Sequence, residues 1–172
     1  WRRKEIDPDW VDSVIAVIPK PGKDMKFACS WRPISLITIC HKVISQLLVK
    51  RMEQHYELIA GEDQGGFRFW RRGTDQILNA RVLAQNLEKA GITGYACFID
   101  LEKAFDLIPR ELLWDAMEYY DFPPEEIAMV KALYTGHTFR VKREGKTSET
   151  KVTTLTGLKQ GDPMSPLLFG IV

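Results

Sequence analysis

Asp100 is the residue of this chain whose sequence context is best suited to chemistry. It follows the apolar run 95–99, which is too short for a helix and contains aromatic and β-branched residues. Such a run predicts a buried strand that carries a carboxylate at its carboxyl end. Because an unpaired buried carboxylate is costly, we expect a divalent cation, a cluster of donors or solvent beside Asp100. A carboxylate that caps the following turn is the alternative.

Two further segments contain residues suited to binding phosphate or a nucleotide-sized ligand. Gly157 and Gly161 bracket Leu158-Lys159-Gln160, and glycines at this spacing let the backbone approach a ligand closely. Arg32 precedes a proline, which biases it toward an extended conformation. Its planar guanidinium suits phosphate oxygens. A surface arginine stacked on Trp31 is the alternative.

Basic residues also occur at a predicted turn after the strand 13–18. Lys20 and Lys23 flank a Pro-Gly pair, and the extended piece 27–30 is predicted to return as the second half of a hairpin. Lysines at such a tip can lie against phosphates, although they equally suit a solvated turn.

The segment 67–72 alternates aromatic residues with Arg68, Arg71 and Arg72. In proteins that bind single-stranded nucleic acid, cations lie on phosphates while rings stack on bases. A loop whose rings turn into the core is the alternative.

Helices and strands must position these residues. Apolar spacing predicts helices over 37–59, from Thr74 as N-cap to Gly91, from Pro109 to Tyr120, and from Pro123 to Gly136. Strands are predicted over 139–142 and 151–155, and Ser165-Pro166 predicts a final helix start. His41 and His55 lack companions at metal-ligand spacing, so we interpret them as ordinary helix residues.

Four segments resemble, in order, successive motifs of reverse transcriptases, most closely those of non-LTR (LINE-like) retrotransposons. They are SWRPISL at 30–36, DQGGF at 63–67, FIDLEKAFD at 98–106 and TGLKQGDPMSPLLF at 156–169. The likeness extends from about residue 14 to the last residue. It implies RNA-directed DNA polymerase activity with an RNA template, a DNA primer, deoxynucleoside triphosphates and two Mg²⁺ ions.

The resemblance also implies roles for single residues. Asp100 would be the catalytic metal ligand, with the Leu101 carbonyl as a second ligand. Phe105 would pack under the sugar and exclude a ribose 2′-hydroxyl. The other implied or candidate contacts are Lys20, Arg32, Gln160 and Gly161 to the nucleotide, and Lys23, Arg68, Arg71 and Arg72 to nucleic acid.

One departure from the family pattern concerns the metal site. The family completes it with two adjacent Asp residues downstream of the Gln-Gly segment, and no Asp-Asp pair occurs in these 172 residues. We therefore expect a fragment of fingers and partial palm that does not polymerise DNA by itself. A non-catalytic RNA-binding or assembly module and a fragment of a group II intron-type maturase are the alternatives.

Composition sets outer limits on the fold. An apolar share of 45% supports a real core, and the predicted class is α+β, with a mainly antiparallel sheet backed by helices. Residues 1–94 are predicted to form a fingers-like basic lobe and residues 95–172 a partial palm. Residues 1–72 hold 13 Lys/Arg against 9 Asp/Glu, whereas residues 73–172 hold 11 against 14. The basic residues of 1–72 could bind phosphates, and the acidic residues of 73–172 could bind metal ions.

Cysteine usage and hydropathy bear on the compartment. Three isolated cysteines without ligand spacing predict reduced thiols. No apolar stretch approaches the ~20 residues needed to cross a bilayer. We expect an intracellular protein, cytoplasmic or nuclear or both, with no membrane partner.

Overall fold

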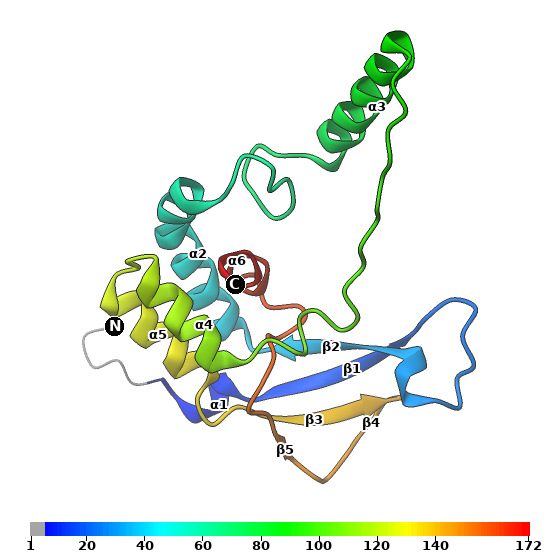
Figure 1. The fold of residues 1–172 in the computed structure, drawn as a ribbon. Coiled ribbons are helices and arrows are strands. Elements are labelled where there is room, and N and C mark those ends of the chain that lie inside the picture. The colour runs from blue at the N-terminus through cyan, green and yellow to red at the C-terminus, as the bar shows by residue number, and fades with distance from the viewer. Residues whose placement is uncertain (1–5) are drawn as a thin grey trace.

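The computed structural model describes residues 6–172. Figure 1 shows a sheet with most of the helices gathered at one end and a single helix standing away from them. In chain order the elements are α1 (Pro8–Val11), β1 (Ser13–Pro19), a 3₁₀ turn (Ala28–Ser30), β2 (Trp31–Ile37), α2 (Ile39–Ile59), α3 (Gly73–Ala90), α4 (Arg110–Tyr119), α5 (Pro124–Tyr134), β3 (Thr138–Arg143), β4 (Lys146–Thr147), β5 (Val152–Thr153) and α6 (Ser165–Ile171).

The sheet is mixed, and the predicted α+β class is confirmed. β1 pairs antiparallel with β2 and parallel with β3, while β3 pairs antiparallel with β4 and β5. The predicted hairpin forms, but its second strand begins at Trp31, because residues 28–30 make a 3₁₀ turn closed by the Ser30 N–H on the Phe27 carbonyl. The assignment of fingers and palm lobes stays a prediction. The one sheet takes strands from both sides of residue 94.

β2 is an edge strand, and its proline suits this position. Ser35 lies opposite Ile15 of β1, and its N–H points away from β1 to donate to the Gln160 carbonyl at 2.6 Å. The backbone nitrogen of Pro33, two residues earlier, also points away from β1. Because proline has no N–H, none of the hydrogen bonds between β1 and β2 is lost there. The outer edge of β2 therefore receives the loop that contains Gln160.

Helices α2, α4, α5 and α6 enclose the main apolar core. In α2, Leu48, Met52 and Tyr56 recur every four residues on one face and are almost fully buried. Side chains from the other three helices pack against them, including Leu113, Met117, Val130, Leu133, Leu167 and Leu168. The predicted helical spacing is thus confirmed, and the core lies beside the sheet rather than under the segment at Asp100.

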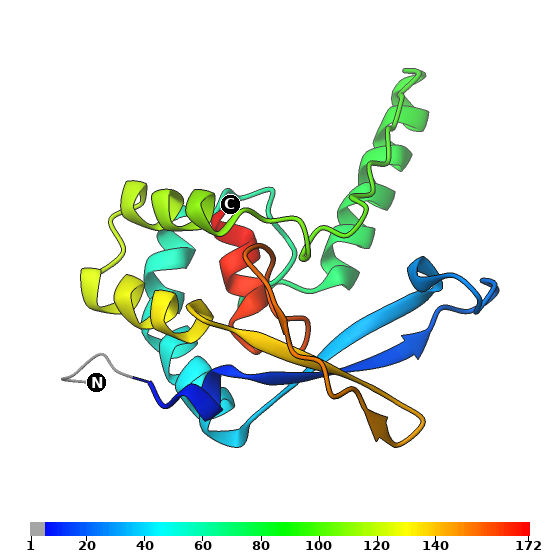
Figure 2. The same cartoon turned by 90° about the horizontal axis from the view of Figure 1, so that it is seen from below.

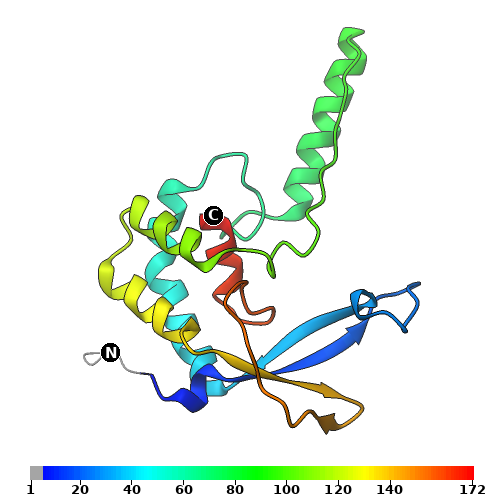
Figure 3. The same ribbon diagram turned by 60° about the horizontal axis from the view of Figure 1, so that its bottom comes forward.

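α3 forms as predicted, but among residues 6–172 it lies apart from the other helices and from the sheet (Figure 2). It ends at Gly91, whose left-handed φ of +66° suits glycine, and none of its residues is buried. Thr74 lies inside the helix, since Arg72 occupies the N-cap. Figures 2 and 3 show the helix and the extended chain that follows it projecting away from the other elements.

The prediction of a buried central strand at 95–100 is wrong in this structure. The segment is extended, but it pairs with no strand within residues 6–172, and Tyr95 and Phe98 are each 96% exposed. An apolar run becomes a buried strand only where a sheet edge is open to it. Here Gln160 occupies part of the outer edge of β2, and β1 and β3 pair with other strands.

The cysteines and the helices bear on the expected compartment. Cys29, Cys40 and Cys97 are free and exposed. None of the helices within residues 6–172 combines the length and the hydropathy required to cross a membrane.

Candidate functional site

The loop between β5 and α6 brings two of the sequence-predicted residues onto neighbouring segments. The Leu158 N–H donates to the Phe105 carbonyl at 2.8 Å, and the Ser35 N–H donates to the Gln160 carbonyl at 2.6 Å. The Gln160 side chain donates from Nε2 to Asp106 Oδ1 at 3.1 Å. Gln160 therefore connects the edge of β2 with the turn that contains Phe105 and Asp106.

The two glycines of this loop are required by close contacts. A Cβ on Gly157 would lie 2.7 Å from the Asp106 carbonyl oxygen, and one on Gly161 would lie 2.9 Å from the Ser35 carbonyl oxygen. Both glycines have positive φ, +82° and +107°. The close approach predicted from their spacing is thus an approach to the protein's own backbone.

A cavity of about 380 Å³ opens between this loop and one face of the sheet. Its volume is in the range of sites for small molecules. Asp106 and Gln160 give it polar groups, and Pro33 and Ser35 line it from β2. The remaining lining residues include Ile15, Val17, Phe139, Val141, Thr154 and Thr156. The cavity thus combines apolar residues with a carboxylate, an amide and the basic side chains of Arg110, His137 and Lys159.

Arg32 is a neighbour of this cavity but does not line it. Because successive side chains on a strand alternate, Arg32 lies on the sheet face opposite Pro33, where it is exposed. Lys20 donates from Nζ to the Cys29 carbonyl at 2.9 Å across the hairpin loop. Lys23 is exposed at the hairpin tip.

Phe105 lies in an aromatic cluster. Its ring stacks on Phe169, with centroids 4.9 Å apart and planes at 25°, and meets Phe67 edge-on at 6.1 Å. Phe105 is half-buried, whereas Phe67 is exposed. Phe105 therefore packs against other rings of the protein, and its contact with a sugar stays a prediction.

Asp100 and Leu101 are exposed on the unpaired extended segment, a few residues before Phe105. Their side-chain carboxylate and backbone carbonyl would give a metal two kinds of oxygen ligand, whereas Mg²⁺ requires octahedral coordination. Within residues 6–172, no group of three or more His, Cys, Asp or Glu side chains is arranged to hold a metal ion. The donors present therefore do not fit a pair of Mg²⁺ ions.

The three arginines predicted to contact nucleic acid differ in their surroundings. Arg68 is nearly buried and donates to Glu57 Oε2 at 3.1 and 2.8 Å and to the Gly61 carbonyl at 2.6 Å. The Glu57 carboxylate raises the pKa of Arg68 above its ordinary value. Arg71 pairs with the exposed Glu62, and Arg72 is exposed at the start of α3. Arg68 thus tethers its own loop, which leaves Arg71 and Arg72 at the surface.

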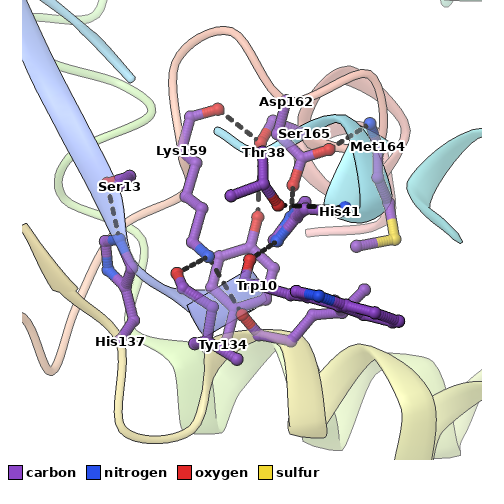
Figure 4. A network of polar contacts seen from close by, with 12 residues as sticks. Trp10, Ser13, Thr38, His41, Tyr134, His137, Lys159, Asp162, Met164 and Ser165 are labelled. Carbon is purple, nitrogen blue, oxygen red and sulfur yellow. Dashed lines mark hydrogen bonds and ion pairs between the residues drawn. The ribbon is translucent and has the colours of Figure 1, made fainter. Parts of the chain in front are cut away.

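Beneath the Gln160 loop lies a buried polar network that was not predicted from the sequence (Figure 4). The Lys159 ammonium is enclosed, with the residue only 3% exposed, and Nζ donates to the carbonyls of Val11 and Leu133 at 3.0 Å each. It also lies 5.2 Å from the centroid of the Tyr134 ring. Burial lowers the pKa of Lys159 to about 7. Lys159 thereby fixes the residue before Gln160 to β1 and α5.

A second contact in this network joins the loop to α2. His41 Nε2 lies 2.9 Å from Asp162 Oδ2, and both side chains are fully buried. His41 Nδ1 donates to the Trp10 carbonyl at 3.0 Å, and Asp162 Oδ1 accepts from the Met164 N–H at 3.0 Å. The interpretation of His41 as an ordinary helix residue is therefore wrong, because it anchors the residue that follows Gly161.

Arg110 holds the strand end that leads into the loop. Its guanidinium donates to the Thr154 carbonyl at 2.7 Å, to Thr154 Oγ1 at 2.9 Å and to the carbonyls of Gly157, Tyr134 and Thr156. His137 bonds to Thr154 Oγ1 at 2.9 Å, and burial lowers the pKa of His137 to about 3, which keeps it neutral. Both sides of the Gln160 loop are thus fixed by buried groups.

The network could have been found from the sequence in part. Lys159 and Asp162 flank Gln160-Gly161 within the segment that carried the family resemblance. The final helix starts at Ser165 as predicted, with Met164 as its N-cap, and the Ser165 hydroxyl donates to the Lys159 carbonyl at 2.8 Å.

Comparison with known proteins identifies the family. A profile described as reverse transcriptase (RNA-dependent DNA polymerase) matches residues 18–172. The chain belongs to the reverse transcriptase family. It is 31% identical over 162 residues to an RNA-directed DNA polymerase from mobile element jockey of Drosophila funebris, covering 91% of this chain and 17% of that protein. Its relatives include the RNA-directed DNA polymerases of non-LTR retrotransposons, as the resemblance indicated.

Two other relatives show how much of a longer protein this reverse transcriptase segment represents. A Pol polyprotein from type-1 retrotransposable element R2 of Popillia japonica is 26% identical over 171 residues, which is 99% of this chain and 24% of that protein. An uncharacterised 149 kDa protein of transposon TX1 of Xenopus laevis is 24% identical over 159 residues, or 92% and 12%. The chain thus spans less than a quarter of the length of these relatives.

Proposed function

We propose that this chain holds the incoming-nucleotide part of an RNA-directed DNA polymerase. The observation that carries the proposal is the meeting of three distant segments at Gln160, whose carbonyl accepts from Ser35 and whose side chain donates to Asp106. Each of the three lies in a segment that resembles a separate reverse-transcriptase motif. Their convergence beside a cavity of about 380 Å³ supports a shared small-molecule substrate.

Within this proposal each residue has a defined role. Gln160 contacts the incoming nucleotide, and Gly161 holds Gln160 in place by packing closely on the Ser35 carbonyl. Neither Arg32 nor Lys20 lines the cavity, so they bind the part of the triphosphate that extends from it onto the β1–β2 hairpin, Arg32 through its paired donors. Phe105 packs under the sugar and excludes a ribose 2′-hydroxyl, which gives a preference for deoxynucleotides.

The reaction proposed for the longer protein is transfer of a nucleotidyl group to a DNA primer on an RNA template. Two divalent ions supply stabilisation of the attacking and leaving oxygens in such reactions. Asp100 and the Leu101 carbonyl are the proposed ligands in this chain, but they do not complete a site for two ions. We therefore propose that the 172-residue polypeptide binds substrate without polymerising.

A primer-extension assay tests this last point. With Mg²⁺, all four deoxynucleoside triphosphates and a DNA primer on an RNA template, the polypeptide is expected to give no extended product. A competent reverse transcriptase run in parallel shows that the template is usable. Robust synthesis that disappears in Asp100→Asn would contradict the proposal.

Nucleotide binding tests the site without requiring catalysis. Gln160→Ala is expected to weaken binding of a fluorescent deoxynucleoside triphosphate by about three- to tenfold, because one hydrogen-bonding group is lost. Arg32→Ala is expected to cost about tenfold or more, since a charged contact is lost. Gln46→Ala on α2 and Arg81→Ala on α3 are the matched exposed controls. If the wild type and all four variants bound the deoxynucleoside triphosphate with equal affinity, the proposed nucleotide site would be wrong.

A non-catalytic RNA-binding module is the second candidate, and the exposure of Asp100 favours it. In that case RNA binding would fall with salt and with loss of Arg71 and Arg72, while Asp100→Asn would have no effect. The polypeptide would also bind no deoxynucleoside triphosphate. The nucleotide titration above therefore separates the two candidates.

A further inference from the structure

Asp106 and Gln160 meet at the wall of the cavity through one hydrogen bond between their side chains. Gln160 Nε2 donates to Asp106 Oδ1 at 3.1 Å, and both residues line the cavity. A carboxylate has only acceptor oxygens, so the Gln160 amide must turn its nitrogen toward Asp106. Within residues 6–172, the amide oxygen Oε1 then accepts no hydrogen bond. The oxygen is therefore the end of the amide that a ligand must satisfy.

The backbones on both sides of this hydrogen bond are held in place. The Asp106 carbonyl lies against Gly157, where a Cβ would come within 2.7 Å of its oxygen, and the Asp106 N–H donates to the Lys103 carbonyl at 2.9 Å. The Gln160 carbonyl accepts from the Ser35 N–H at 2.6 Å. If the amide turned over, Oε1 would face the Asp106 carboxylate, and two acceptors repel each other. The orientation of the amide is thus set by Asp106.

The basic side chains that line the cavity are already used by groups of the protein itself. Arg110 and Lys159 donate to backbone carbonyls, and each ring nitrogen of His137 lies 2.9 Å from a hydroxyl oxygen. Among the ion pairs within residues 6–172, none includes Asp106. The negative charge of Asp106 therefore repels a triphosphate. This wall of the cavity favours the uncharged part of a nucleotide, its sugar or its base.

The free acceptor on Gln160 narrows this choice to the sugar. The bases differ from one another in their donors and acceptors, so no base donor is common to all of them. Every deoxynucleotide, in contrast, carries a 3′-hydroxyl on its sugar. An acceptor that serves all the deoxynucleotides therefore meets that hydroxyl. A nucleotide without it would leave Oε1 unpaired, which weakens binding.

We propose that Asp106 is a positioning residue, which holds the Gln160 amide in the orientation that selects nucleotides with a 3′-hydroxyl. Asp106 acts through Gln160 and does not need to touch the nucleotide. The inference rests on the proposed function for the choice of a nucleotide as the ligand. It adds the residue that determines which chemical group Gln160 can recognise.

Competition titration with thymidine triphosphate and its 3′-fluoro analogue tests the role of Asp106. The wild type is expected to bind the 3′-hydroxyl compound about tenfold more tightly, because fluorine cannot donate to Oε1. Asp106→Asn keeps a hydrogen bond to Gln160 but accepts either end of the amide, and a turned amide offers an N–H to fluorine. The preference is therefore expected to fall to about threefold or less. Asp115→Asn on α4 is the matched exposed control and should keep the full preference.

Gln160→Ala shows whether the preference depends on the amide. It is expected to reduce the preference to about twofold or less. Combining it with Asp106→Asn should reduce the preference no further, because Asp106 acts only through Gln160. A purely structural role of Asp106 would weaken binding of both compounds equally and leave their ratio unchanged. That result would overturn the proposal, and so would an equal effect of Asp106→Asn on the ratio in the presence and absence of the Gln160 side chain.

An NMR measurement separates failure of this inference from failure of the proposed function. The side-chain amide signal of Gln160, identified by its loss in Gln160→Ala, should shift in Asp106→Asn and stay in place in Asp115→Asn. If nucleotide binding is weakened by Gln160→Ala but the signal does not shift in Asp106→Asn, the proposed function stands and this inference has failed. If the wild type binds neither compound, the nucleotide site and its selectivity have both failed, and a shifted signal leaves Asp106 only as the residue that orients Gln160. Far-UV circular dichroism verifies that each variant is folded.

Discussion

Asp162→Ala is expected to lower the free energy of unfolding by about 3–5 kcal/mol, because it leaves a buried partner unpaired. His41 and Asp162 are both fully buried, and the atoms Nε2 and Oδ2 are 2.9 Å apart. The same carboxylate also accepts the Met164 N–H at the start of α6. The substitution therefore removes two hydrogen bonds of a buried carboxylate, and water does not reach the site to replace them. Urea unfolding followed by circular dichroism at pH 7 measures the change.

The hydrogen bonds between His41 and Asp162 explain why Asp162→Asn should lower the free energy of unfolding by less than Asp162→Ala does. The Trp10 carbonyl can only accept, so His41 Nδ1 carries a proton, and a further proton lies between Nε2 and the Asp162 carboxylate. Asp162→Asn keeps an oxygen for the Met164 N–H and offers the imidazole a neutral amide. Its expected cost is about 1–3 kcal/mol.

An exposed aspartate is the control for this series. Asp115→Ala on α4 should change the unfolding free energy by less than about 0.5 kcal/mol. If Asp162→Ala and Asp115→Ala had equal effects, the pair would have no stabilising role. In that case the Gln160 loop would depend on its other anchors alone.

Local features of the sequence predicted the helices well. The helical spacing of apolar residues over 37–59 identified α2, and Gly91 marked the end of α3. The turn chemistry around Lys20 and Lys23 predicted the β1–β2 hairpin. Each of these features depends on residues close together in the chain.

The strand expected before Asp100 failed because strand formation depends on a partner elsewhere. The apolar pattern of 95–99 shows that the segment prefers an extended and buried state, but it does not show whether a sheet edge is open. Within residues 6–172 no strand pairs with it, and Phe98 remains exposed. The position of Asp100 is therefore not determined by its neighbours in the sequence.

The polar network was missed for a related reason. His41 and Asp162 are 121 residues apart, and a single histidine on a helix gives no local sign of a buried carboxylate partner. Lys159 differs, because it precedes Gln160 in the segment recognised as a motif. Lys159 lies between Gly157 and Gly161 and directly precedes Gln160. This position in the sequence could have indicated that Lys159 anchors the loop.

Lys159 gives the second large prediction: the stability of the protein should rise between about pH 7 and pH 10. Burial lowers the pKa of Lys159 from its ordinary 10.5 to about 7. In this window the folded state holds a neutral amine while the unfolded chain still binds a proton. The unfolding free energy then increases by about 1.4 kcal/mol per pH unit. Below pH 7 both states are protonated, so the cost of burying the ammonium is fully present.

The hydrogen-bond geometry around Nζ also favours the neutral amine of Lys159, as burial does. A neutral amine has two N–H groups, and Nζ faces two carbonyl acceptors, those of Val11 and Leu133. Within residues 6–172, the third N–H of an ammonium has the face of the Tyr134 ring as its neighbour. Asp162 opposes the shift because its charge favours the ammonium, whereas Arg110 adds to it.

Chemical denaturation at pH 7, 8, 9 and 9.5 measures the slope. Lys159→Met should remove it, because the titrating group is gone, and should leave the acid-side dependence from His137, whose pKa is lowered to about 3. A wild type with constant or falling stability over this range would contradict the prediction, and so would a Lys159→Met variant that keeps the rise. If that variant does not fold, the slope of the wild type still decides. Since Lys159 adjoins Gln160, a neutral amine would fix the loop most firmly on the alkaline side of neutrality.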